Sequence, residues 1–349
     1  MPPAASSHHE LEPLGWDDAW AEELQALHPD AEPARVTQHH GAGLVLASVG
    51  GERQLMFTQR LSPEPTVGDW VAVLDDEVVA VLPRRSLLRR RAAHGDGEQA
   101  LAANVDVVLL VCGLDRPVKD GRIQRGTAIA HDGGARPVVV LTKSRRGSVD
   151  VEPEAVAEEV RAAHPGVEVL LTSVKEGLGL DDLRRVVGAG TVTLLGESGA
   201  GKSSIVNALL GDAVAAVGDV REGDAKGRHT TTGREMHILD AGGVLIDTPG
   251  IRAVGLVTDT DAVAETFTDV DEVAALCRFS DCQHDGQPGC ALEEAVEAGE
   301  LSPERVEAWK RLHAEAEAAA RRASPVEQHR HERRFGRVVK DAQRRKGRS

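Results

Sequence analysis

The sequence of 349 residues contains no tyrosine, and aromatic residues make up only 2% of it. Its longest apolar stretches, such as 107–112, fall far short of the roughly 18 residues that a membrane-spanning helix needs. The first ten residues, MPPAASSHHE, lack the basic and the apolar segments of a secretory signal. Four cysteines are too few for a disulfide scaffold. These absences predict a cytoplasmic protein that does not bind a membrane.

The net charge of −15 argues against a nucleic-acid partner, but the charges are distributed unevenly. Residues 321–349 carry eleven Lys and Arg against three Asp and Glu. A second basic cluster without acidic residues consists of Arg84, Arg85, Arg89, Arg90 and Arg91. On composition alone, these groups are either RNA-binding patches or a solvated face followed by a disordered tail.

The pattern of the chain changes several times along its length. Residues 1–35 are a loose leader with one short helix predicted near 16–27. Residues 36–92 contain four short β-like runs separated by glycines, which predicts a small β-barrel of the OB type. Between 93 and 258, buried strand-like runs alternate with helical segments and predict a parallel sheet covered by helices; the runs are 105–112, 137–142, 167–172, 191–195 and 243–247.

The last third of the chain is predicted to be mainly helical. Residues 259–320 form a helical domain, and 321–349 form the basic tail. Ser302 is the expected N-cap of a helix that begins with Pro303. Val306, Trp309 and Leu312 recur on one face of that helix and are expected to be buried.

A phosphate-binding motif lies between a strand-like and a helix-like run. Residues 196–203 read GESGAGKS and match GxxxxGK[ST], whose backbone N–H groups converge on phosphate oxygens at a helix N-terminus. We expect Lys202 to reach the β- and γ-phosphates and to act in catalysis, and Ser203 to ligate Mg²⁺. The predicted phosphate-binding residues are Gly196, Glu197, Ser198, Gly199, Ala200, Gly201, Lys202, Ser203 and Ser204.

Two further segments downstream fit a nucleotide site. Asp247 and Gly250 belong to a DTPG sequence at the end of a strand-like run. The Asp247 carboxylate would bind Mg²⁺, and the Gly250 N–H would donate a hydrogen bond to the γ-phosphate. By itself such a sequence is also compatible with a surface turn. The loop GRHTTT offers Thr231 as a further Mg²⁺ ligand and His229 as the group that positions or activates water. A loop histidine is equally compatible with simple solvation.

The candidates for reading the base lie upstream of the phosphate motif. Thr142, Lys143, Ser144 and Arg145 follow one buried strand-like run, and 173–175 follow the next. Small GTPases carry N/T-K-x-D and an S-A-K-like loop downstream of the P-loop. The order here is therefore a circular permutation of that fold. The predicted residues of the second loop are Ser173, Val174 and Lys175.

Three of the four cysteines cluster with one histidine near the start of the helical region. Cys277, Cys282, His284 and Cys290 supply three thiolates and one imidazole, a closed set suited to one structural zinc ion. Cys112 lies inside a strand-like run and is expected to be a small buried hydrophobic residue.

Over residues 35–320 the chain resembles the circularly permuted, small-subunit-dependent GTPases of the RsgA family. The resemblance is carried by VGDWV, LPRRS, LAANVD, GRHTTT, the permuted motif order and the Cys/His cluster. It implies an α/β P-loop GTPase core with an OB-like barrel before it and a helical zinc-binding domain after it. It also implies GTP hydrolysis with Mg²⁺, a catalytic role for His229, and Ile251 in place of a water-positioning glutamine. The implied partner is the small (30S) ribosomal subunit through its 16S rRNA, in late maturation.

One position departs from the family pattern. Arg145 stands where an aspartate accepts two hydrogen bonds from guanine, and a guanidinium has no acceptor. Two functions therefore remain open. The first is a monomeric GTPase of small-subunit assembly whose nucleotide state, through the switch segments, is coupled to rRNA binding. The alternative is an RNA-binding assembly protein with weakened or non-guanine nucleotide specificity.

Overall fold

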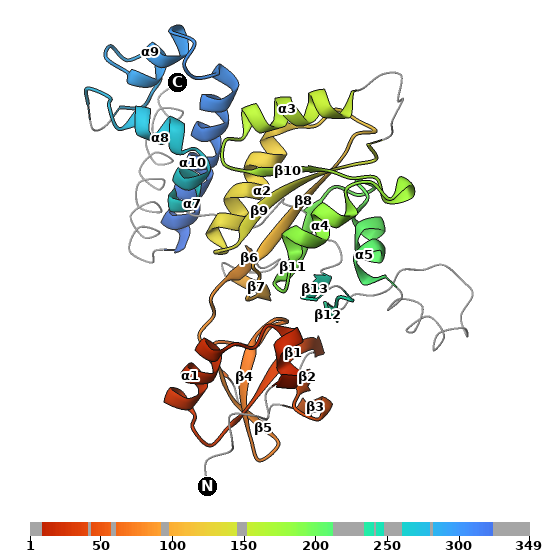
Figure 1. Cartoon of the computed structure of the whole chain (residues 1–349). Coiled ribbons are helices and arrows are strands. Elements are labelled where there is room, and N and C mark those ends of the chain that lie inside the picture. Colours follow the sequence, from red (N-terminus) through yellow and green to blue (C-terminus); the bar gives the residue numbers. More distant parts are fainter. Residues whose placement is uncertain are drawn as a thin grey trace, which may run out of the picture. The chain divides into compact units, whose positions relative to one another are not determined.

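The computed structural model describes residues 9–40, 43–56, 61–91, 98–144, 152–211, 234–240, 242–247, 260–279 and 282–323. The chain forms two compact units, whose elements are labelled in Figure 1. The first unit comprises residues 1–90 and 99–256, and the second comprises 91–98 and 257–349. Each of the two units includes residues from more than one of the five domains expected from the sequence. The division into five domains therefore stays a prediction.

Five antiparallel strands near the N-terminus build the OB-like barrel. β1 pairs with both β2 and β4, β2 pairs with β3, and β4 pairs with β5. β3 and β5 contact each other, which brings the two ends of the curved sheet together. Val36, Leu46, Val71 and Val73 lie in its apolar interior. The strands are β1 (Glu32–His40), β2 (Gly43–Ser48), β3 (Gly51–Met56), β4 (Trp70–Leu74) and β5 (Glu77–Val81).

The segment before the barrel is part of the packed structure. It contains a 3-10 helix, η1 (His9–Leu14), and α1 (Asp18–Leu27). Asp17 caps α1, because its Oδ1 accepts a hydrogen bond from the Trp20 N–H at 2.9 Å. Trp20 is buried, and its ring lies 6.3 Å from that of Trp70. The predicted end of the leader at residue 35 falls inside β1.

A central sheet with strand order β10-β9-β8-β11-β13-β12 forms the second half of this unit. All neighbouring pairs are parallel except β12 and β13. Each of the five strand-like runs predicted for this region forms a strand, and β12 is an additional one. The strands are β8 (Val107–Gly113), β9 (Arg136–Thr142), β10 (Glu168–Leu171), β11 (Thr191–Gly196), β12 (Glu235–Ile238) and β13 (Val244–Asp247).

Helices cover both faces of the central sheet (Figure 1). Apolar side chains of α2 and α3, such as Ile129 and Val160, pack in one cluster with Val108 of β8. Leu183 of α4 and Ile205 of α5 pack in another with Leu109, the next residue of β8. Successive residues of a strand point to opposite faces, so the two helix pairs lie on opposite sides. The helices are α2 (Asp120–Asp132), α3 (Pro153–Ala163), α4 (Leu180–Val187) and α5 (Lys202–Leu210).

The strand order places a binding crevice at the middle of this sheet. The chain builds β8, β9 and β10 outward in one direction and then returns to β11 beside β8. It continues to β12 and then to β13, which lies between β11 and β12. Ligands of open α/β sheets bind at the carboxyl ends of the strands where the order reverses. That point lies between β8 and β11, and the segments after both strands carry polar residues.

A buried arginine joins the barrel to the central sheet. Arg35 of β1 is 1% exposed. Its guanidinium donates hydrogen bonds to the Thr191 Oγ1 at 2.8 Å, to the Gly68 carbonyl at 3.2 Å and to the Leu14 carbonyl. Burial lowers the pKa of Arg35 to about 10, so the side chain stays charged at neutral pH. β1 also pairs with β12 through Gln38 and Glu235.

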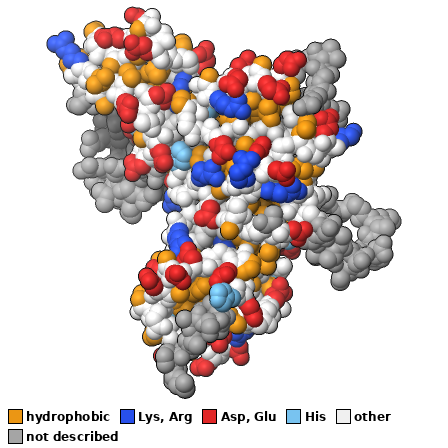
Figure 2. All heavy atoms as spheres, in the orientation of Figure 1, with side chains coloured by type: hydrophobic (Ala, Val, Ile, Leu, Met, Phe, Trp, Pro, Cys, Tyr) orange, Lys and Arg blue, Asp and Glu red, His pale blue; other side chains and the backbone are white. Residues whose placement is uncertain are grey.

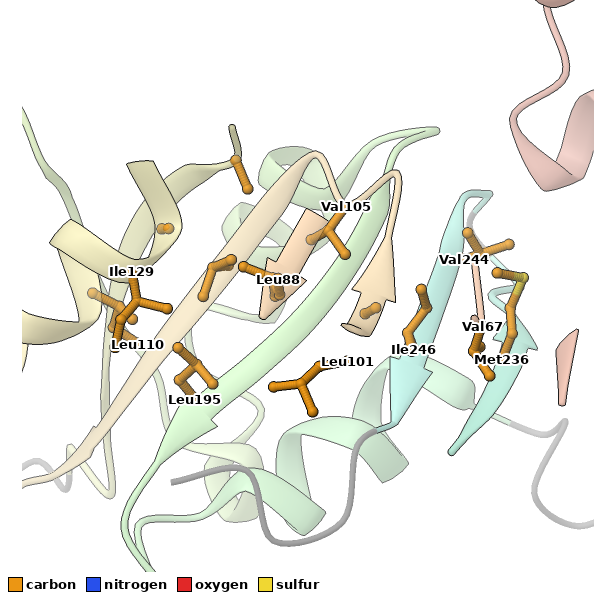
Figure 3. Packing of buried hydrophobic residues seen from close by; sticks show 14 of the residues in the cluster. Val67, Leu88, Leu101, Val105, Leu110, Ile129, Leu195, Met236, Val244 and Ile246 are labelled. Carbon is orange, nitrogen blue, oxygen red and sulfur yellow. The ribbon is translucent and has the colours of Figure 1, made fainter. Parts of the chain in front are cut away.

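Apolar contacts complete this junction. Figure 3 shows Val67 beside Met236, Val244 and Ile246 of the central sheet, and these residues belong to one continuous cluster. Gly68 has a φ of 97°, and a Cβ at that position would lie 2.1 Å from the Ala103 carbonyl oxygen. Only glycine therefore fits here. β6 (Leu87–Arg91) and β7 (Glu98–Ala103) form a separate two-stranded sheet.

The second unit is helical, as the sequence predicts, and consists of α7 (Thr260–Thr266), α8 (Thr268–Ala274), α9 (Ala291–Glu297) and α10 (Pro303–Ala323). Ser302 caps α10, because its Oγ accepts a hydrogen bond from the Arg305 N–H at 3.1 Å. Val306, Trp309 and Leu312 are buried, as expected. Within the described part of the chain, no helix combines the length and the apolar character needed to cross a membrane.

Candidate functional site

The P-loop motif connects β11 to α5, the strand–loop–helix context that the sequence predicts. Gly199 and Gly201 have positive φ values of 77° and 104°. A Cβ at Gly201 would lie 3.1 Å from the Thr142 Oγ1, so both the backbone conformation and the close neighbour favour glycine. Gly201 is the N-cap of α5 and offers no side chain to the helix N–H groups, which leaves those of the first turn for an anion.

Lys202 begins α5 and folds back over the loop. Its Nζ donates hydrogen bonds to the Gly196 and Glu197 carbonyl oxygens, each at 2.7 Å. These bonds hold the ammonium inside the loop whose backbone would surround a phosphate chain. Ser203 and Ser204 follow in the exposed first turn of the same helix. Glu197 forms an ion pair with Arg122 of α2.

Asp247 lies at the carboxyl end of β13, next to the strand that leads into the P-loop. Parallel pairing brings the ends of β11 and β13 to the same edge of the sheet. A hydroxyl from Ser203 and a carboxylate from Asp247 are the hard oxygen ligands that Mg²⁺ prefers. These residue types therefore fit Mg²⁺. Asp247 also stands opposite Glu235 of β12 in the register of the sheet.

The upstream base motif meets the P-loop in space. The Thr142 Oγ1 donates a hydrogen bond to the Ala200 carbonyl. The Lys143 Nζ donates to the Gly199 carbonyl at 2.8 Å and to the Asp115 Oδ2 at 2.7 Å. The structure thus brings together two segments that are more than fifty residues apart in the sequence, as the permuted arrangement requires.

Asp115 is a residue of this site that the sequence reasoning missed. The hydrogen bonds from Lys143 and Arg116 lower the pKa of Asp115 to about 2, so the carboxylate is charged and orients the lysine at neutral pH. A signal was present, since Asp115 lies two residues after the end of the buried strand β8, and Asp247 similarly ends β13.

The second predicted base loop lies beside the first. The Ser144 N–H donates to the Thr172 carbonyl at 3.2 Å, which ties the two loops together. Ser173 is buried, and Val174 and Lys175 belong to a short 3-10 helix, η2 (Val174–Glu176), that contacts α5. Arg145, His229, Thr231, Gly250 and Ile251 lie outside the described residues, and their predicted roles stay predictions.

The four predicted zinc ligands gather in the second unit. The ligating atoms of Cys277, Cys282, His284 and Cys290 all lie within 4.8 Å of one another. The His284 Nδ1 is 3.5 Å from the Cys277 Sγ and 3.6 Å from the Cys290 Sγ. Usual Zn–S and Zn–N lengths at a tetrahedral angle give an S···N separation of about 3.5 Å. The donor set and its spacing therefore fit one zinc ion with four protein ligands.

Comparison with known proteins agrees with this geometry. A model of the RsgA GTPase family matches residues 81–257. The small ribosomal subunit biogenesis GTPase RsgA of Xanthomonas campestris pv. campestris (strain B100) is 39% identical over 337 residues, which cover 92% of each chain. The protein of the same name from Opitutus terrae is 43% identical over 343 residues, covering 90% of this chain and 92% of that one. The chain belongs to the RsgA GTPase family.

Solved structures show the same RsgA-type fold. The structure of YjeQ from Thermotoga maritima matches with a TM-score of 0.60 and 25% identity, covering 82% of this chain and 98% of that chain. YloQ, described as a circularly permuted GTPase, matches with a TM-score of 0.57 and 20% identity over 84% of this chain and 97% of that chain. The predicted fold, a permuted P-loop core with a barrel and a helical zinc-type domain, is confirmed.

Removing one of the four predicted zinc ligands tests the metal site in the helical unit of this RsgA-family protein. Cys282→Ser is expected to lower bound zinc from one equivalent to none and to destabilise the helical unit, because structural zinc contributes its binding energy to folding. Elemental analysis and thermal unfolding followed by circular dichroism measure the two effects. Ser302→Ala, in the same unit but away from the cluster, is the control that keeps its zinc. Full zinc occupancy in the Cys282→Ser protein would contradict the assignment.

Three arginines of the second basic cluster, Arg84, Arg85 and Arg89, form ion pairs within the protein. The side chains of Arg90 and Arg91 lie outside the described residues, so RNA contact by this cluster stays a prediction. The Arg84 Nε and Nη2 donate to the two carboxylate oxygens of Asp69, each at 2.8 Å, and Asp69 is 0% exposed. Arg89 pairs with Asp132, whose side chain is 2% exposed. Arg85 pairs with the Asp17 carboxylate, which also caps α1. The buried carboxylates of Asp69 and Asp132 need such partners, which gives Arg84 and Arg89 a structural role.

Arg84→Ala is expected to destabilise the first unit by about 3–5 kcal/mol, because it leaves the buried Asp69 carboxylate without its bidentate partner. Chemical denaturation measures this change. Arg53→Ala, which removes an arginine paired on the exposed surface of the barrel, is the control and is expected to cost less than about 1 kcal/mol. Equal stabilities of the Arg84→Ala and Arg53→Ala proteins would refute the structural role.

Cys112 behaves as the small apolar residue that the sequence predicts. It is partly buried and packs against the main apolar cluster. Burial raises the pKa of Cys112 to about 11, which makes it a poor nucleophile at neutral pH. It lines a cavity of about 440 Å³ beside the P-loop, together with Leu110, Ile123 and Leu195.

Proposed function

We propose that this RsgA-family GTPase acts in the biogenesis of the small ribosomal subunit and that its nucleotide state is coupled to rRNA binding. The observation that carries the proposal is the assembly of one site from permuted segments. Lys143 of the base motif and Lys202 of the P-loop both bond to carbonyls of the same loop. The relatives named as small ribosomal subunit biogenesis GTPases support the cellular role.

In the proposed reaction the protein binds and orients the triphosphate. The Lys202 ammonium and the N–H groups at the start of α5 offset the negative charge of the β- and γ-phosphates. Ser203, Asp247 and Thr231 would hold Mg²⁺, which when bound neutralises charge that develops on the transferred phosphate. His229 would position the attacking water, in line with its place in the GRHTTT segment.

The sheet provides a physical route for coupling. Gln38 of the barrel strand β1 pairs with Glu235 of β12, and Glu235 pairs with Asp247 of β13. A displacement at the predicted Mg²⁺ carboxylate would thus reach the barrel across two backbone pairings. We propose that the barrel contacts 16S rRNA and that the chain works as a cytoplasmic monomer.

Hydrolysis assays with small subunits test the function. We expect slow hydrolysis by the free chain and at least tenfold faster hydrolysis with purified small subunits; large subunits serve as the control. A non-hydrolysable GTP analogue should retain the chain on small subunits in sedimentation, whereas GDP should release it. Absence of both stimulation and binding would refute the proposal.

The alternative function, an RNA-binding protein with a degenerate nucleotide pocket, is not favoured. Its basis is Arg145 alone, whereas the Lys143, Asp115 and Lys202 interactions of a working pocket are in place.

A further inference from the structure

Residues 260–318 of the helical unit, which include the predicted zinc ligands, are strongly acidic. Residues 260–279 and 282–318 contain fourteen Asp and Glu against four Lys and Arg. Eleven of these acidic residues are exposed, compared with two of the basic ones, Arg278 and Arg311. On this unit, Figure 2 shows acidic side chains beside a patch of hydrophobic ones.

The other two basic residues are used inside the unit. The Arg305 Nε and Nη2 each lie 2.6 Å from an oxygen of Asp269, and the side chain is only 11% exposed. The Lys310 Nζ donates to the His284 carbonyl and lies 3.6 Å from the Asp285 carboxylate. Over residues 260–318 the exposed charge is therefore predominantly acidic.

Two exposed apolar side chains flank the zinc ligand Cys277. Leu276 is 75% exposed and Phe279 is 50% exposed. The tryptophans and Phe267 are all buried, so Phe279 is the one exposed aromatic residue among those that the structure describes. The Arg278 guanidinium lies 5.4 Å from the centroid of the Phe279 ring.

The backbone holds this pair in place. The Arg278 N–H donates to the Gly289 carbonyl at 3.1 Å, and the Cys282 N–H donates to the Phe279 carbonyl at 3.2 Å. These bonds, with the neighbouring metal ligands, fix the loop from which Leu276 and Phe279 project. Apolar anchors that are already ordered lose little entropy on binding, and aromatic residues are enriched among the residues that dominate interfaces.

We propose that Leu276 and Phe279, with the acidic surface of this unit, form a docking site for a basic protein component of the small ribosomal subunit. An RNA backbone would meet like charge here, whereas a Lys- and Arg-rich protein surface complements it. Leu276 and Phe279 would supply the apolar contact at the centre of the interface, which charged residues alone do not provide. This inference rests on the proposed function, namely that the chain binds small subunits.

A photo-crosslinker at the anchor identifies the partner. The full chain with Phe279→p-benzoylphenylalanine is bound to purified small subunits with a non-hydrolysable GTP analogue, sedimented and irradiated. The expected adduct resists ribonuclease and contains peptides of a subunit protein. An adduct with rRNA, an adduct with the chain's own residues 324–349, or no adduct on bound particles would each overturn the proposal. Failure to sediment with small subunits would count against the proposed function instead. The same crosslinker at Leu27, which is 52% exposed in the first unit, is the position control. An adduct that forms from both positions is not specific to the surface around Phe279.

A double variant measures the contribution of the apolar pair. Leu276→Ser with Phe279→Ser is expected to weaken association with small subunits about tenfold or more. Zinc content and hydrolysis by the free chain should stay unchanged. Met56→Ser, which alters a 61% exposed residue of the barrel, is the matched surface control. Unchanged affinity of the zinc-replete double variant would refute the docking site.

Discussion

Lys202→Ala is expected to lower kcat for GTP hydrolysis by about 10²- to 10³-fold, the loss seen when one preorganised transition-state donor is removed. The Lys202 Nζ lies within 2.7 Å of two P-loop carbonyls, so it is already positioned inside the loop that surrounds the phosphates. Charge on the γ-phosphate oxygens redistributes during the transfer, and a fixed ammonium stabilises it without reorganisation. Steady-state release of phosphate, with and without small subunits, measures the effect.

Arg161→Ala is the matched control for this experiment. Arg161 also carries a positive charge, but it lies on α3 and pairs with Glu158 on the surface. Its removal should leave kcat within about twofold of the unaltered chain, since exposed pairs contribute little. An unchanged kcat in the Lys202→Ala protein would show that Lys202 does not act in catalysis.

Arg145→Asp is expected to raise the preference for GTP over ATP by about 10³-fold or more. A site built to hydrogen-bond a ligand rejects analogues that leave its polar groups unpaired. The new carboxylate would accept bonds from two guanine nitrogens, each worth about 1.5–3 kcal/mol because the acceptor is charged. The neighbouring base-motif residue Lys143 is already held in place by hydrogen bonds to Asp115 and to the P-loop. Competition binding of GTP, ATP and ITP to both proteins provides the measurement.

ITP makes this prediction specific, because it lacks the exocyclic amino group of guanine. An aspartate at position 145 would accept a hydrogen bond from that group, so the Arg145→Asp protein should prefer GTP over ITP at least about tenfold more strongly than the unaltered chain does. Arg146→Asp makes the same charge change one residue later and should not alter the ratio. Strong preference of the unaltered chain for GTP over ITP would show that another group reads the base.

The parts of the fold with strong local signals could be predicted from the sequence. Near-continuous Val and Leu runs marked the five parallel strands, because strands buried on both faces need no alternation. The P-loop and zinc ligands were found from spacing, since glycine conformations and tetrahedral coordination require particular residues at particular distances. The meeting of Lys143 with the P-loop followed from the permuted motif order.

The parts that depend on tertiary partners could not be predicted in this way. β1 contains Pro33 and Arg35 and lacks an apolar alternation, so it did not read as a strand; its pairings with β2, β4 and β12 hold it. The arginines 84, 85 and 89 form a basic cluster in the sequence, yet in the structure each forms an ion pair with a carboxylate that is distant in sequence. Charge counts along a chain do not show which charges are already paired.

The buried guanidinium of Arg35 limits how this protein can be divided or recombined. A chain that started after residue 35 would lose the donor that the Thr191 hydroxyl and the Gly68 carbonyl share in the interior. It would also lose Trp20, whose ring packs near Trp70. We therefore expect that the barrel does not fold as a transferable module and that its folding is coupled to that of the nucleotide-binding sheet. An exchange of the barrel between relatives would therefore have to include the matching part of the nucleotide-binding sheet.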